Sequence, residues 1–199
     1  MLKRCGWLGV LSLSMGLLCF APEAAAQSGV LPDERARETV RIEKGANFGP
    51  VLESYGSFFN FDDQELVTPD TVYKVVFDAN ATTERGAMNP QITAAARFLN
   101  MHVGSGIPKE NVQAAVVLYG PATQDALSNA AHQARFGVDN PNIPLIEALA
   151  DVGVRIYVCV QSASMIGIRP DEIEAPARMT LSGLTALVKL QTDGYQRVY

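Results

Sequence analysis

Hydrophobic and polar residues follow a regular order from residue 72 onward. Residues 72–78, VYKVVFD, form a β-rich alternating run, and residues 112–119 form a second run that is apolar almost throughout. Residues 154–160 form a third run rich in β-branched side chains. Such short runs, bounded by polar or glycine-containing segments, are typical of β-strands. The pattern predicts three strands, the second of them covered on both faces.

Between and after these runs, apolar residues recur at helical spacing. Asn89 and Pro90 form a typical N-cap and first helical residue, and GSG at 104–106 ends the helix that they begin. Later helices are predicted to end at glycines, which commonly terminate helices. The predicted apolar stripes are Ile92, Ala95, Ala96, Leu99 and Val103; Leu127, Ala130, Ala131 and Ala134 before Gly137; Leu145, Ile146, Leu149 and Ala150 before Gly153; and Leu184, Leu187, Val188 and Gln191 before Gly194.

The third strand is followed by a predicted loop, a helical turn near residues 170–174, a strand near 178–181 and a last strand at 195–199. Strands that alternate with helices of this length indicate right-handed crossovers. The sequence therefore predicts an α/β domain over residues 71–199, with a mostly parallel sheet and helices on both faces.

The first 26 residues have the features of a secretory signal peptide. Lys3 and Arg4 precede an apolar stretch at residues 7–20, which ends before three alanines at 24–26. The stretch is shorter than the roughly 20 residues that a membrane span needs. Leu18, before Cys19, also argues against lipid attachment. We expect export to the periplasm, without a stable membrane anchor.

Residues 27–70 form an N-terminal extension. Its first part, residues 27–44, is polar and indicates a linker or a short surface helix. Residues 45–70 contain an aromatic group that the domain itself or a neighbouring subunit is expected to cover, with an aromatic ligand box as the alternative. This group comprises Phe48, Tyr55, Phe58, Phe59 and Phe61.

Composition and motifs exclude several classes of function. The hydrophobic content of 48% fits a packed core. The formal charge is −5, and no basic stripe with interleaved aromatic residues is present, so nucleic acid is not an expected partner. Residues 78–89, DANATTERGAMN, lack GxGxxG, so no nucleotide cofactor is expected. Two separated histidines and one cysteine outside the signal peptide do not form a metal-ligand pattern.

Cysteine chemistry depends on the signal peptide. Cleavage of the signal peptide removes Cys5 and Cys19. Cys159 is then the single cysteine of the mature chain, so no intrachain disulfide can form. In an oxidising compartment this thiol must stay buried, pair with another molecule or take part in chemistry. Free cysteine is among the most buried residue types, so an inert core position beside Arg155 and Tyr157 is the alternative to a functional one.

The position of Cys159 makes it a candidate site residue. Ligands of open α/β sheets bind at the carboxyl ends of the strands, where a thiol can also meet a helix N-terminus that lowers its pKa. The third strand ends at Cys159, and the first two end in polar or loop residues. The predicted binding residues at these ends are Asp78, Asn80, Tyr119, Gly120, Gln161 and Ser162.

Four segments, in this order and spacing, resemble the DsrE/DsrF-like family (YchN-like fold) of small sulfur-relay and related proteins, which includes exported members. They are YKVVFDA, VVLYGPA, NIPLIEALADVGVRIYVCVQSASMIGIRPDEI and LSGLTALVKLQTDGYQRV, from Tyr73 to near the C-terminus. The resemblance implies a three-layer α/β/α fold that assembles into trimers or hexamers. It also implies that Cys159 accepts sulfur as a persulfide and passes it on, with the Gly120 loop lining the pocket. Tyr119 stands where many relatives have a histidine.

Three hypotheses follow. The first is an exported, oligomeric protein with sulfurtransferase-like activity that relays sulfur through Cys159 between a donor and an acceptor protein. The second is a non-catalytic module that binds a small molecule or a protein. The third is a cysteine hydrolase, which would need His102 or His132 beside the thiol, although both histidines are predicted to lie on helix surfaces.

Overall fold

The computed structural model of the protein describes residues 45–61 and 64–199. The predicted signal peptide and the polar part of the extension, residues 1–44, lie outside the described residues, and these predictions stay open. The described residues belong to one compact unit. Among them, no helix is long and apolar enough to cross a membrane.

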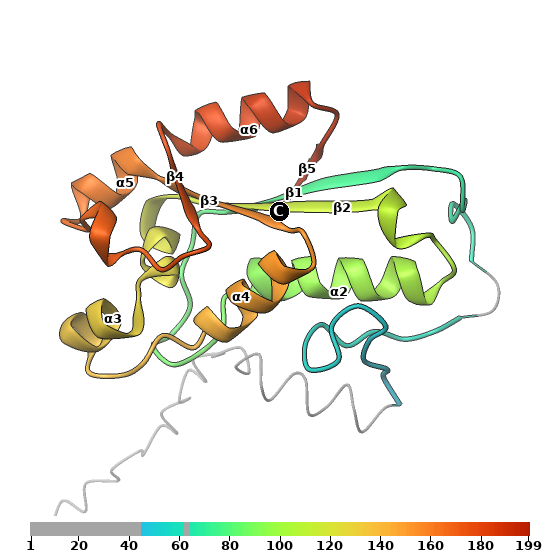
Figure 1. The fold of residues 1–199 in the computed structure, drawn as a ribbon, viewed down its shortest axis with the longest axis horizontal. Coiled ribbons are helices and arrows are strands. Elements are labelled where there is room, and N and C mark those ends of the chain that lie inside the picture. Colours follow the sequence, from blue (N-terminus) through green and yellow to red (C-terminus); the bar gives the residue numbers. More distant parts are fainter. Residues whose placement is uncertain (1–44, 62–63) are drawn as a thin grey trace, which may run out of the picture. The chain divides into compact units, whose positions relative to one another are not determined.

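A five-stranded sheet, with strand order β4-β3-β2-β1-β5, runs through the domain (Figure 1). All four strand pairs are parallel; for example, Phe77 pairs with Val116, and Val116 with Ile156. The prediction of an α/β fold with a mostly parallel sheet is therefore confirmed. The strands are β1 (Tyr73–Ala79), β2 (Val112–Leu118), β3 (Arg155–Cys159), β4 (Arg178–Thr180) and β5 (Gln196–Val198).

Helices cover both faces of this sheet, with α2 and α4 on one side and α6 on the other (Figure 1). The predicted start of α2 is confirmed: Pro90 is its first residue, and the Asn89 side chain accepts a hydrogen bond from the backbone N–H of Gln91. The α-helices are α2 (Pro90–Gly104), α3 (Asn129–Phe136), α4 (Ile143–Asp151), α5 (Val160–Met165) and α6 (Gly183–Thr192). Three 3₁₀ helices are η1 (Lys109–Asn111), η2 (Gly120–Ala126) and η3 (Pro170–Glu172).

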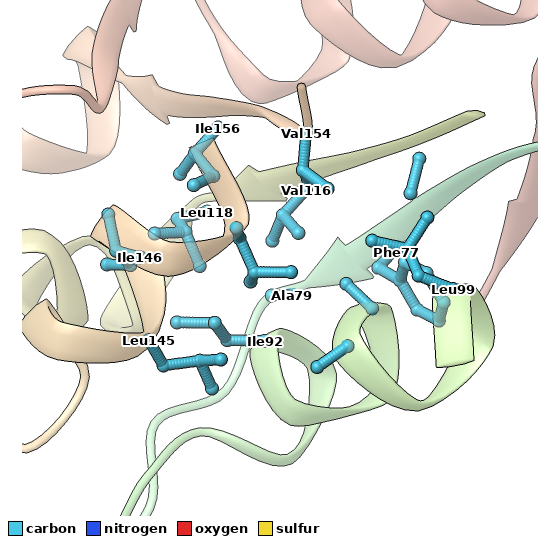
Figure 2. Packing of buried hydrophobic residues seen from close by; sticks show 14 of the residues in the cluster. Phe77, Ala79, Ile92, Leu99, Val116, Leu118, Leu145, Ile146, Val154 and Ile156 are labelled. Carbon is cyan, nitrogen blue, oxygen red and sulfur yellow. The ribbon is translucent and has the colours of Figure 1, made fainter. Parts of the chain in front are cut away.

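Alternate residues of the strands build two apolar layers. Figure 2 shows the larger layer, in which Phe77, Val116 and Ile156 pack against residues of α2 and α4. On the other face, Val76 and Val117 pack against α6. Two covered faces explain why β2 has an apolar sequence almost throughout.

Two predicted helix stripes are wrong in part, although Leu127, Ala131 and Leu187 are buried as predicted. In α3, Ala130 and Ala134 are exposed, whereas Ala131 and His132 are buried. In α6, Leu184 and Val188 are exposed. The buried stripe of α6, Gly183, Ala186, Leu187 and Leu190, has the same helical spacing as the predicted one and shares Leu187 with it. Spacing alone could not choose between the two stripes, because the packing against the sheet decides which one is buried.

Residues 160–165 correct the prediction of a loop after β3. They form α5, whose N-cap is Cys159. A helix of six residues is too short to show an apolar period, so the sequence pattern did not reveal it.

Residues 45–61 of the extension pack against α2. Phe58 is buried, and it lies so close to Gly104 that a Cβ atom there would come within 2.4 Å of the Phe58 ring. Gly56 lies against the α2 backbone near Ala96 in the same way. The domain thus covers part of the aromatic group, as one of the two predictions proposed, while Phe61 remains 70% exposed.

Candidate functional site

Cys159 is the last residue of β3 and is only 4% exposed. Val158, its neighbour, packs in the core layer beneath α2 and α4. Because successive side chains of a strand point to opposite faces, Cys159 lies on the α6 face of the sheet. The thiol therefore lies where β3 ends and where α5 begins.

Hydrogen-bond donors surround the Cys159 sulfur. The Ser162 hydroxyl and the Ser162 backbone N–H each lie 3.3 Å from Sγ, and the backbone N–H groups of Gln161 and Gly183 also donate to it. Burial raises the pKa of the Cys159 thiol, but these hydrogen bonds outweigh burial and hold the pKa below its ordinary value. Gln161 and Ser162 open α5 and Gly183 opens α6, so the positive ends of two helices favour a thiolate here.

Ser162 links the thiol to the loop after β2. Its Oγ accepts a hydrogen bond of 2.8 Å from the backbone N–H of Gly120, which leaves the hydroxyl proton to be donated to Cys159 Sγ. Gly120 has a φ of 54°, and a Cβ atom on it would lie 3.2 Å from the Asn80 carbonyl. Only glycine adopts this conformation readily, so the turn that orients Ser162 depends on it.

Tyr119 packs beside the same site. Its ring lies against Gly183, where a Cβ atom would come within 2.8 Å of the Tyr119 Cβ. Burial raises the pKa of the Tyr119 hydroxyl, and its hydrogen bond to the Asp78 carboxylate and that carboxylate's charge raise it further. Interactions with Asn80 and Arg197 oppose this increase. Tyr119 therefore stays protonated at neutral pH, beside the Asp78 carboxylate.

Asp78 is held by an ion pair that crosses from β1 to β5. Its side chain is completely buried, and Arg197 donates to its Oδ2 through both Nε and Nη2. β5 is the last strand in sequence but lies next to β1 in the sheet. The sheet order therefore supplies the cation that makes a buried carboxylate tolerable at this position.

The structure thus places all seven predicted site residues at one edge of the sheet. Cys159, Ser162 and Gly120 form one hydrogen-bonded group, while Asp78, Asn80 and Tyr119 form a second group that Gly183 connects to the first. Gln161 is exposed, and its side chain donates to the Leu181 carbonyl.

Sequence reasoning missed two residues of this site, Gly183 and Arg197. Ser182 followed by glycine at the start of an apolar helical pattern is a signal that could have marked Gly183 as the beginning of a helix. No local signal marks Arg197, because its partner Asp78 lies 119 positions away in the sequence.

Neither histidine contacts Cys159. The prediction that both lie on helix surfaces is wrong, because His132 is 6% exposed with its Nδ1 2.7 Å from the Val138 carbonyl, and His102 is half-buried against the Phe98 and Tyr73 rings. The hydrolase hypothesis therefore has no base beside the thiol. Within residues 45–61 and 64–199, no group of three or more His, Cys, Asp or Glu side chains could hold a metal ion.

Replacing Ser162 with alanine tests the electrostatics of the thiol. The change removes one of the hydrogen bonds that stabilise the thiolate, so we expect the pKa of Cys159 to rise and its alkylation by iodoacetamide at pH 7 to slow roughly tenfold. The rate measured as a function of pH should show its midpoint displaced to higher pH. Ser164→Ala, an exposed change in the same helix, should leave the profile unchanged. Equal profiles for both variants would contradict this role of Ser162.

An all-parallel sheet covered on both faces, with a hydrogen-bonded cysteine at the end of a central strand, defines a small α/β domain with a strand-end thiol. The chain belongs to the DsrE/DsrF-like family, whose model matches residues 72–198.

Comparison with solved structures finds two small proteins of low identity. A protein of unknown function, MTH1491 from Methanobacterium thermoautotrophicum, is 20% identical, with a TM-score of 0.48 over 63% of this chain and 97% of its own. The ychN protein from E. coli is 16% identical, with a TM-score of 0.46 over the same shares of the two chains. No curated protein matches the chain.

Proposed function

We propose that this protein is an exported member of the DsrE/DsrF-like family that binds sulfur as a persulfide on Cys159 and relays it to an acceptor. The observation that carries the proposal is the ring of donors around Sγ, contributed by Ser162 and by the first residues of α5 and α6. The thiolate, rather than the thiol, attacks sulfur, so stabilising the thiolate prepares Cys159 for this chemistry. The association of the DsrE/DsrF-like family with sulfur relay also supports a role for Cys159 in sulfur transfer.

The reaction requires no cofactor. The Cys159 thiolate attacks the outer sulfur of a donor persulfide, R–S–SH, whose S–S bond breaks as a new S–S bond forms. The products are the persulfide of Cys159 and the donor thiolate, R–S⁻. Attack by an acceptor thiolate on the outer sulfur of Cys159 then returns the cysteine to its thiolate form, so sulfur is transferred without any added oxidant or reductant.

We further propose that the protein acts in the periplasm as a trimer or hexamer. The signal-like N-terminus supports export. The outer side of α6 supports assembly, because Leu184 and Val188 are 74% and 65% exposed and Leu181, just before the helix, is 68% exposed. Contiguous exposed apolar residues of this kind commonly mark interaction surfaces. The proposed partners are a sulfur donor and a sulfur acceptor protein.

The alternative is a binding or assembly module without covalent chemistry. The low exposure of Cys159, 4%, favours this alternative, because an inert thiol is normally buried. In this case the edge of the sheet presents Asp78, Tyr119 and their loops to a small molecule or protein, and Cys159 serves only as packing.

Intact mass distinguishes the two functions. The chain is produced from Gln27, so that Cys159 is its only cysteine, and is weighed before and after exposure to polysulfide. We expect the wild type to gain the mass of one sulfur atom and to lose that mass on reduction. We expect the Cys159→Ala variant to gain no mass. No gain in the wild type would overturn the relay proposal and leave the binding module. Native mass spectra of the same samples measure the number of subunits in the assembly.

A further inference from the structure

A second feature of the molecule lies away from Cys159: a cavity of about 160 Å³ that we call the polar cavity. The loop between β1 and α2 forms one wall, and η2, α3 and the residues before α4 form the others. Two of its lining residues, Asp125 and His132, are ionisable side chains that are 4% and 6% exposed. Its other lining residues include Thr82, Glu84, Arg85, Gln124 and Phe136.

Asp125 is a buried carboxyl group whose hydrogen-bond partners are neutral. Thr82 Oγ1 donates to Oδ1 at 2.7 Å, and Asn89 Nδ2 donates to Oδ2 at 2.6 Å. Within the described part of the chain, Asp125 has no ion pair, unlike the buried Asp78. Burial raises the pKa of Asp125 to about 6, against these hydrogen bonds and the influence of His132, which lower it. At neutral pH the carboxylate is therefore ionised, and burial penalises its charge.

His132 leaves one ring nitrogen available at this cavity. Its Nδ1 lies 2.7 Å from the Val138 carbonyl, so Nδ1 carries the proton, because a carbonyl oxygen can only accept. In the neutral ring, Nε2 is then an acceptor, and no described residue donates to it. Asp125 and His132 together offer acceptor atoms to whatever occupies the cavity.

One cation, the Arg85 guanidinium, already lies against the aromatic wall of the cavity. The Arg85 guanidinium lies 5.0 Å from the centroid of the Phe136 ring, and both residues line the cavity. Arg85 is exposed and belongs to the β1–α2 loop, as does the exposed Glu84. With Asp125 and Glu84 ionised and Arg85 as the one positive charge, the lining carries net negative charge when His132 is neutral. An anionic ligand would be repelled by the two carboxylates.

We propose that the polar cavity binds a small organic cation with N–H donors, an amidinium, guanidinium or primary ammonium compound, with Asp125 as its counter-ion. The ligand donates to Asp125 and to His132 Nε2. The cavity is below the roughly 300–1,000 Å³ of drug-sized pockets, which limits the ligand to a few heavy atoms. This binding is independent of sulfur chemistry at Cys159, which does not line the cavity.

Methylguanidinium and its neutral analogue N-methylurea test the proposal, because the two probes have nearly the same shape. We expect methylguanidinium at pH 7.5 to shift the NMR amide signals of the 82–87 loop and of Gln124 and Asp125 saturably, and N-methylurea to bind at least about tenfold more weakly, the factor typical of a hydrogen bond to a charged group. Two results would overturn the proposal. One is equal binding of both probes, and the other is the absence of a saturable shift at about 50 mM probe, a concentration that is ample for a millimolar site.

Variants and pH locate the counter-ion. Asp125→Asn should weaken methylguanidinium binding about tenfold, whereas Asp151→Asn, an exposed change at the end of α4, should not alter it. Because Asp125→Asn can impair folding, the wild type is also titrated at pH 5. At pH 5 Asp125, with its pKa of about 6, is mostly protonated and no longer offers a negative charge to the cation. The other ionisable groups that line the cavity are His132, Glu84 and Arg85. An affinity for methylguanidinium that is the same at pH 5 and pH 7.5 would overturn the role of Asp125.

Discussion

Replacing Asn100 with alanine is expected to lower the free energy of unfolding by about 4 kcal/mol, because the change leaves several buried backbone groups without partners. Asn100 is completely buried in α2. Its Oδ1 accepts from the backbone N–H groups of Val51 and Leu52, at 3.1 and 2.8 Å. Its Nδ2 donates to the carbonyls of Leu52, Tyr55 and Gly56, at 2.9, 2.7 and 3.1 Å.

This amide is the main polar link between the extension and the domain. Water does not replace these hydrogen bonds while the segment stays packed. In the variant, therefore, either the backbone groups of residues 51–56 stay buried without partners, which lowers stability, or the segment is released from the domain. Denaturant unfolding measures the loss of stability, and hydrogen exchange at the amides of Val51 and Leu52 shows whether the segment is released. Asn111→Ala is the matched control, because Asn111 makes one exposed side-chain hydrogen bond, to Pro69. A loss below about 1 kcal/mol in Asn100→Ala would show that the extension is not held through this residue.

The second large effect is a change of stability with pH that originates at Asp125. Its pKa is about 6 in the folded protein against an ordinary value of 3.8. The folded state therefore holds the proton more tightly than the unfolded state. As pH rises from 4 to 7, ionisation of Asp125 lowers the free energy of unfolding by a growing amount. This amount reaches about 3 kcal/mol once Asp125 is ionised in both the folded and the unfolded state.

The Asp125→Asn variant isolates this contribution. The difference in unfolding free energy between variant and wild type should move by about 2 kcal/mol in favour of the variant between pH 4 and pH 7, because the unfolded chain is already partly ionised at pH 4. Titrating groups that do not interact with Asp125 cancel in this difference. Chemical denaturation at four or five pH values provides the measurement. A difference that does not vary with pH would mean that Asp125 ionises as it does in the unfolded chain.

Asp171→Asn is a control with the opposite sign. The Arg169 side chain donates to Asp171 and holds the pKa of that carboxyl below its ordinary value. The wild-type carboxylate thus contributes stability at neutral pH that is lost as pH falls, so this variant loses stability relative to wild type as pH rises. The two aspartates should therefore give slopes of opposite direction in the same assay.

Local sequence patterns determined most of the secondary structure. The alternation at 72–78 and the apolar run at 112–119 correspond to β1 and β2, and the Asn89–Pro90 pair marks the start of α2. These features depend on residues within one or two turns of each other, and their spacing follows directly from helix and strand geometry. The rule that ligands bind at strand ends also predicts that Cys159, Gly120 and Ser162 lie together at one edge of the sheet.

The tertiary structure alone decided which side chains face one another across the sheet. Arg197 reaches Asp78 because β5 lies next to β1, and the buried side of α6 follows from how closely Gly183 approaches Tyr119. The partners of Asn100 and the burial of Asp125 likewise come from segments that meet only on folding. Periodicity along a chain records which residues share a face of one element. The element packed against that face is set by strand order and by the fit of surfaces, which local spacing does not encode.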